Sequence, residues 1–262
     1  MSFAPFHRGG EGPPLLLLHG FTDTCRTWEL VTPALERRFE VFAPTLAGHA
    51  GGPGFPAEGA SDDAIVDAVE AALDEIGWEA PAIAGNSLGG FIALRLAERG
   101  RARSVVALAP AGGWVDDDPA IAEVLGYFRT MAPMVRDAAP RAHLIASTPE
   151  GRAAASVTYA STADHLNADL VTHLIRGGAA CDSEPLVAFA EREGWQFDPE
   201  RITCPVRLVW GTDDKILVLP AAAARFRTDL PQAEWIEIDG AGHCPQLDHP
   251  LETAELIASF SS

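Results

Sequence analysis

The stretch that decides the fold is PAIAGNSLGGFIALRLAER, which runs from Pro81 to Arg99. Residues 81–85 predict a short buried strand, and residues 88–99 predict a helix with an apolar stripe that ends at Gly100. Between them, Gly85 and Gly89 flank Ser87 in the pattern Gly-x-Ser-x-Gly. A tight turn from strand to helix needs small residues at those two positions. The turn therefore projects the serine hydroxyl at a helix N-terminus, where backbone N–H groups can stabilise a nearby oxyanion.

Similar segments alternate on both sides of this turn. Short apolar runs predict strands over residues 14–18, 40–43, 104–109, 206–210 and 234–238. Helical spacing predicts helices over residues 61–76, 120–135, 169–176, 184–193, 220–230 and 250–260, with Ser61 as the cap of the first. Such alternation is typical of the α/β class, with a mostly parallel, doubly wound sheet covered on both faces. A short antiparallel edge strand is expected near residues 3–8.

The alternation breaks in the middle of the chain. Residues 112–200 contain helix-like stretches but no convincing strand. We therefore expect residues 1–111 to form the first part of an α/β core, residues 112–200 a helical insertion, and residues 201–262 the second part of the core.

Composition excludes several classes of partner. The 262 residues carry 19 basic and 37 acidic side chains, a formal charge of −18, which disfavours nucleic acid and anionic membranes. The longest early apolar run, residues 15–18, is far too short to span a membrane, and no signal peptide is visible, so a cytoplasmic protein with a small-molecule substrate is expected. Oligomeric state is left open.

Cofactors and metals are not expected either. Lys215 is the single lysine, so Schiff-base chemistry would depend on that one residue. The four cysteines are widely spaced and form no CxxC pair, which argues against a zinc site or a disulfide framework and predicts reduced, packed thiols.

A serine hydroxyl needs a base to become a nucleophile. His243 follows the last predicted strand in the glycine-rich segment DGAGH. The base in turn needs a carboxylate on its other nitrogen, and Asp213 and Asp214 lie just after the strand that ends at Trp210. The chain order is then Ser, Asp, His.

These segments together resemble the α/β-hydrolase superfamily. The matching pieces are HGF at residues 19–21, the turn at Ser87, WGTDD at residues 210–214 and GAGH at residues 240–243. The resemblance implies that Asp214, not Asp213, is the acid. It also implies an oxyanion hole from the backbone amides of Phe21 and Leu88, and no cofactor. His19 and His49, in loops after the first two parallel strands, would be structural.

The resemblance also narrows the reaction. Haloalkane dehalogenases and epoxide hydrolases of this fold place an aspartate where this chain has Ser87, which argues against both. The stretch GNSLGG looks like the turns of carbon–carbon bond hydrolases and small carboxylesterases. We therefore expect hydrolysis of a neutral, largely apolar carboxylic ester. Carbon–carbon bond hydrolysis, cofactor-free perhydrolysis and a small-molecule receptor that retains the triad are the alternatives.

The predicted insertion resembles the helical cap that covers the active site in these enzymes. Its six arginines and 14 acids give it a charge of −8, which disfavours multiply anionic substrates. Six of its side chains are candidates to line an apolar pocket, although the same side chains could simply hold the cap on the core: Trp114, Tyr127, Phe128, Met131, Met134 and Trp195.

Overall fold

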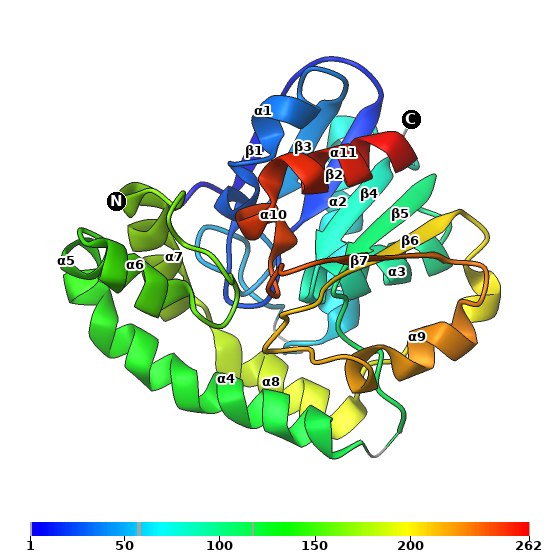
Figure 1. Ribbon diagram of the computed structural model, residues 1–262. Coiled ribbons are helices and arrows are strands. Elements are labelled where there is room, and N and C mark those ends of the chain that lie inside the picture. The colour runs from blue at the N-terminus through cyan, green and yellow to red at the C-terminus, as the bar shows by residue number, and fades with distance from the viewer. Residues whose placement is uncertain (1, 57–58, 117, 262) are drawn as a thin grey trace.

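A seven-stranded sheet forms the centre of the molecule in the computed structural model, which describes residues 2–56, 59–116 and 118–261 (Figure 1). Its order is β1-β3-β2-β4-β5-β6-β7. The strands are β1 (Phe6–Gly9), β2 (Pro14–Leu18), β3 (Glu40–Pro44), β4 (Ala82–Asn86), β5 (Ser104–Leu108), β6 (Val206–Gly211) and β7 (Glu234–Ile238). Only β1 pairs antiparallel, with β3. This confirms the predicted fold class; the edge strand begins three residues later than expected.

Alternating side chains of the strands build one core on each face of the sheet. Leu16 and Leu18 of β2 pack on the face covered by α2 (Asp62–Ile76), α3 (Leu88–Glu98) and α9 (Ala224–Asp229). Leu15 and Leu17 face the other way, toward α1 (Thr32–Leu35) and α11 (Pro250–Phe260). The inner strands β2 to β6 are therefore buried, as parallel strands covered on both faces are expected to be.

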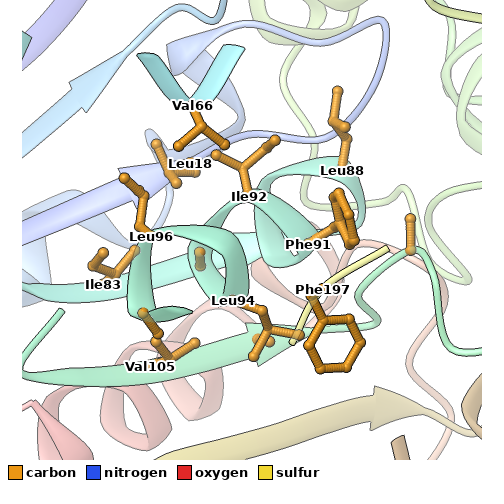
Figure 2. Close-up of a cluster of buried hydrophobic side chains, with 14 of the residues drawn as sticks. Leu18, Val66, Ile83, Leu88, Phe91, Ile92, Leu94, Leu96, Val105 and Phe197 are labelled. Carbon is orange, nitrogen blue, oxygen red and sulfur yellow. The ribbon is translucent and has the colours of Figure 1, made fainter. Parts of the chain in front are cut away.

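The helix α3 is buried almost all round, and its side chains anchor the serine turn. Figure 2 shows Leu94 and Leu96 of α3 near Ile83 and Val105 of the sheet. All of these side chains have no exposed surface. A helix fixed in this way leaves little freedom at its N-terminus, where Ser87 lies.

Most predicted elements are present, with differences at helix ends. Ser61 caps α2 as expected, because its hydroxyl accepts from the N–H of Ala64 at 2.9 Å. The expected helix over residues 220–230 is instead a 3₁₀ turn, η4 (Ala221–Ala223), followed by α9. Among the elements that no periodicity revealed are three short ones on the core: η1 (Cys25–Trp28), α1 and α10 (Pro245–Asp248).

Helices fill the chain between β5 and β6, as the sequence suggests. They are α4 (Pro119–Ala138), η2 (Ala139–Arg141), α5 (Ala142–Ile145), α6 (Pro149–Ser156), α7 (Ala168–Ala180) and α8 (Ser183–Glu193), before η3 (Pro199–Arg201). Figure 1 shows the long α4 along the outside of this group, where it packs on α7 and α8. That residues 112–200 form a cap with those boundaries stays a prediction, and Met1 and Ser262, which end the outer predicted segments, lie outside the described residues.

Two further properties follow from the described part of the chain. No helix within it is long and apolar enough to cross a bilayer. All four cysteines are free thiols: Cys25, Cys181 and Cys244 are buried, and Cys204 is partly exposed.

Candidate active site

The turn between β4 and α3 holds Ser87 in a strained backbone conformation, with φ 54° and ψ −116°. A Cβ on Gly85 would overlap the carbonyl oxygen of Gly89, and a Cβ on Gly89 would overlap that of Leu18. Only glycine therefore fits at either position. A non-glycine residue at this φ costs on the order of 1–3 kcal/mol, which the surrounding packing must offset. The N–H of Ser87 donates to the Leu108 carbonyl at 2.9 Å and fixes the turn to β5.

The structure brings His243 and Asp214 together as expected. Nδ1 of His243 donates to Oδ2 of Asp214 at 2.8 Å, and both side chains are buried. The other carboxylate oxygen accepts from the N–H groups of Ile216 and Leu217, at 2.8 Å each. The carboxylate is thus fixed on both sides. Asp213 is exposed and does not contact the imidazole.

Polar side chains on the core hold the loop that carries His243. Asn86, next to the serine, donates from Nδ2 to the His243 carbonyl at 2.9 Å. Its Oδ1 accepts from Nε2 of Gln246 at 3.1 Å, and Gln246 also donates to the Thr27 hydroxyl at 3.2 Å. All of these groups are buried, so each hydrogen bond restricts the loop in a low-dielectric environment.

Asp248 fixes the same loop to the helical segment. Its carboxylate accepts from the N–H of Gly242 at 2.6 Å, and from those of Ser161 and Thr162 at 2.9 and 2.8 Å. The residue before His243 is therefore tied to a turn between α6 and α7.

Two backbone amides near Ser87 are unused. Leu88 is the first residue of α3, so its N–H has no partner within the helix. Among the described residues, neither this amide nor that of Phe21 has a hydrogen-bond acceptor. Gly20 brings the second loop close, since a Cβ there would lie 3.3 Å from Cβ of Ser87.

His19 and His49 have structural surroundings. Nε2 of His19 accepts from the N–H of Leu46 at 2.9 Å, and its Nδ1 donates to the Gly20 carbonyl at 2.8 Å. Burial holds the pKa of His19 well below its ordinary value, and burial lowers the pKa of His49 to about 4. Both imidazoles are therefore neutral at physiological pH and shape the loop before Phe21.

Two cavities meet at Ser87. The larger one has a volume of about 140 Å³, and the smaller, almost entirely apolar one about 30 Å³. Ser87, Phe21, Phe128 and Ile216 line both, whereas His243 lines the larger. The serine thus lies where the two spaces join.

The helical segment supplies most of the cavity walls. Of the predicted pocket residues, Tyr127, Phe128 and Met131 line the larger cavity, and Trp114, Phe128 and Trp195 line the smaller. Met134 was a wrong choice: its side chain is 58% exposed, because it lies on the outer face of α4.

Sequence reasoning missed several polar residues in the larger cavity, among them Asp23 and Tyr159. Asp23 could have been found, since it lies two residues after Phe21 in the same loop. Tyr159 follows α6 in an irregular stretch and has no local signal. Within the described residues, no group of three or more His, Cys, Asp or Glu side chains could hold a metal ion.

Known proteins resemble this chain over most of its length. The family model described as "Alpha/beta hydrolase family" matches residues 15–256. Epoxide hydrolase EphH of Mycobacterium tuberculosis is 34% identical over 203 residues, which cover 76% of this chain and 94% of that protein. Pimeloyl-(acyl-carrier protein) methyl ester esterase of Aromatoleum aromaticum is 30% identical over 251 residues, 94% of this chain and 96% of that one.

A solved structure shows the same fold. The 2-hydroxy-6-oxo-6-phenylhexa-2,4-dienoate hydrolase of Rhodococcus sp. strain RHA1 superposes with a TM-score of 0.75 at 18% identity, and the match covers 97% of this chain and 93% of that one. The two curated relatives are an epoxide hydrolase and a methyl ester esterase, so they agree on hydrolysis and not on the substrate.

Proposed function

The chain belongs to the alpha/beta hydrolase family and is a hydrolase, and we propose that it cleaves a neutral, largely apolar carboxylic ester through an acyl-enzyme on Ser87. One observation carries the proposal. Ser87, held in a strained turn, lines the same cavity as the imidazole of His243, and that imidazole is hydrogen-bonded to Asp214. These three groups are what nucleophilic acyl transfer requires.

The reaction follows from the roles of these groups. Nε2 of His243 takes the hydroxyl proton as Ser87 attacks the ester carbonyl, and Asp214 stabilises the resulting imidazolium. The amides of Phe21 and Leu88 bind the oxyanion, aided by the positive N-terminus of α3. His243 then protonates the leaving alcohol and activates a water that hydrolyses the acyl-enzyme.

Serine chemistry favours esters over the epoxides named in one relative. Attack of a carboxylate on an epoxide gives an ester, which water can hydrolyse to release the diol. Attack of the Ser87 hydroxyl would give an alkyl ether, which this site has no means to cleave. We therefore do not assign to this chain the epoxide hydrolysis named for that relative.

Charge in the cavities favours esters over the dienoate named in the solved structure. A dienoate carries a carboxylate, which is best bound by arginine or lysine. In the described residues, neither cavity is lined by an arginine or a lysine, and the larger one already contains Asp23. A second carboxylate there would be repelled.

A substrate panel tests the proposal. We expect turnover of 4-nitrophenyl esters, with a preference for a chain length that fits the cavities, and no comparable turnover of a phenylhexadienoate or of styrene oxide. Ser87→Ala should lower ester turnover by more than about 10³-fold while the fold is retained. Faster turnover of the dienoate or the epoxide than of every ester would overturn the proposal, as would an active Ser87→Ala protein.

A further inference from the structure

The larger cavity contains a carboxylate that the proposed reaction does not use. Asp23 lines this cavity two residues beyond Phe21. Its Oδ1 accepts from the N–H of Thr24 at 2.7 Å, and the Thr27 hydroxyl also stabilises the ionised form. Within the described residues, Asp23 has no ion-pair partner. Burial accordingly raises the pKa of Asp23 to about 6, so the group is ionised at neutral pH and poorly compensated.

A second polar group lines the same cavity. The hydroxyl of Tyr159 has no hydrogen-bond partner among the described residues. Burial raises the pKa of Tyr159, and the charges of Asp23 and Cys244 raise it further. Tyr159 is therefore a neutral phenol that can both donate and accept.

The position of this pair is held by groups already described. The carbonyl of Tyr159 accepts from the N–H of Cys244 at 2.7 Å, directly after His243. Asp23 lies in the loop of Phe21, and its N–H donates to the Gly20 carbonyl at 3.3 Å. Both side chains are thus fixed relative to the reacting atoms, by the two loops that meet at Ser87.

We propose that Asp23 and Tyr159 form a polar subsite that binds a hydrogen-bond-donating group of the substrate, a hydroxyl or a protonated amine. This proposal rests on the proposed ester hydrolysis and refines its substrate, which stays largely apolar but carries one donor group; with a protonated amine the substrate is cationic instead of neutral. An ionised carboxylate accepts hydrogen bonds and cannot donate them, so it selects donors and rejects carboxylates. The uncompensated charge of Asp23 is then neutralised by the substrate, and the excess of acids in residues 112–200 attracts cationic molecules to the same cavity.

The subsite complements the smaller cavity on the other side of Ser87. That cavity is lined by apolar side chains such as Trp114, Leu125 and Val187. One side of the cleaved ester bond would therefore be apolar, and the other would end in a donor. An ester that is apolar on both sides leaves Asp23 desolvated and unpaired, which costs binding free energy.

Ligand binding tests the subsite without requiring catalysis. We would measure n-butylamine, n-butanol and butyrate by calorimetry at pH 8 on the inactive Ser87→Ala protein. The amine is expected to bind at least about 10-fold more tightly than butyrate, with butanol between them. Asp23→Asn should reduce the amine-to-butyrate ratio at least about 10-fold, and Tyr159→Phe by a smaller factor. Asp164→Asn removes an exposed acid of the same helical segment and should leave the ratio as it was.

Turnover of two esters gives a second test of the subsite. On the active protein, 2-(dimethylamino)ethyl butyrate should have a higher kcat/KM than the isosteric 3-methylbutyl butyrate, and Asp23→Asn should reverse this preference. Three results would overturn the proposed subsite. They are equal affinities for the amine and butyrate, no binding of any of the three ligands, and an amine-to-butyrate affinity ratio that Asp23→Asn does not change. None of these results bears on Ser87, whose role fails only if esters are not cleaved or Ser87→Ala remains active.

Discussion

The floor and the wall of the larger cavity are built in different ways. The floor consists of Ser87, His243 and the amide of Phe21, each placed within a few residues of the end of a strand of the sheet. The wall consists of side chains from α4 and α7 and from the turn near Tyr159, placed by packing between distant parts of the chain. The floor is therefore constrained by local backbone geometry, whereas the wall depends on contacts between segments that are distant in the sequence. This difference explains why a hydrolase can be inferred with more precision than its substrate.

The largest expected effect separates two neighbouring acids on the floor. Asp214→Asn should lower ester kcat by about 10³- to 10⁴-fold, because the imidazole loses the carboxylate that orients it and stabilises its charge. Asp213→Asn, one residue away and exposed, should keep full activity. Steady-state kinetics of the two purified variants measures both. Equal losses of kcat in the two variants would mean that activity depends on the turn at residues 213–214 and not on the buried hydrogen bond between Asp214 and His243.

Substitutions of two glycines compare how the floor and the wall respond in the free energy of unfolding. Gly89→Ala should lower the free energy of unfolding by about 3 kcal/mol, because the new Cβ would overlap the backbone of Leu18. Gly126→Ala, in the exposed helix α4 with open space around it, should raise that free energy by about 0.5–1 kcal/mol. Urea denaturation of both variants gives the values. A stable Gly89→Ala protein would contradict the account of the turn.

The hydrogen bonds of Asp248 connect floor and wall. Asp248→Asn keeps the size of the side chain but weakens its acceptance from three backbone N–H groups. We expect kcat to fall by about 10-fold with a smaller change in KM, and stability to fall by about 1–3 kcal/mol. Asp164→Asn, which changes an exposed acid of the helical segment that lines neither cavity, serves as the control. A change in KM alone would mean that Asp248 acts in substrate binding and not in positioning His243.

The charge of Asp23 affects stability in a way that depends on pH. Its pKa in the folded protein is about 6, above the ordinary 3.8, because of burial. The folded state therefore binds the proton more tightly, and the contribution of Asp23 to stability is full below about pH 4 and is lost as the pH rises through 6. Tyr159, Cys244 and Cys25 are the titratable groups whose pKa values respond to Asp23, and all three stay neutral across this range.

Asp23→Asn should therefore stabilise the protein by about 1–3 kcal/mol at pH 8 and have little effect at pH 4. Urea denaturation at the two pH values measures this. A variant destabilised at pH 8 would show that Asp23 is structural and that its charge is well compensated.

The sequence predicted the strands and the floor better than the wall, for a physical reason. Strands such as Pro14–Leu18 are buried on both faces and read as continuous apolar runs, and the serine turn tolerates only glycine at two fixed positions. The neighbouring acids at 213 and 214 were separated by motif position, and the structure places only Asp214 against His243.

The wall was less predictable because its residues are not periodic. The stripe of α4 indicated Phe128 and Met131 correctly but could not tell which turn of the helix faces solvent, so Met134 was included wrongly. Tyr159 lies outside any regular element, and its place in the same cavity as Asp23 depends on how α6 and α7 pack over the core. Such contacts between distant segments leave no pattern in the local sequence.

Covalent labelling tests the central claim most directly. A fluorophosphonate reacts with a serine only when a neighbouring base and an oxyanion hole activate it. We predict a single stoichiometric label on the peptide that contains Ser87, found by mass spectrometry, with no label on the Ser87→Ala protein and greatly slowed labelling of Asp214→Asn. A label on another residue, or an unlabelled protein that still hydrolyses esters, would contradict the assignment of Ser87 as the nucleophile.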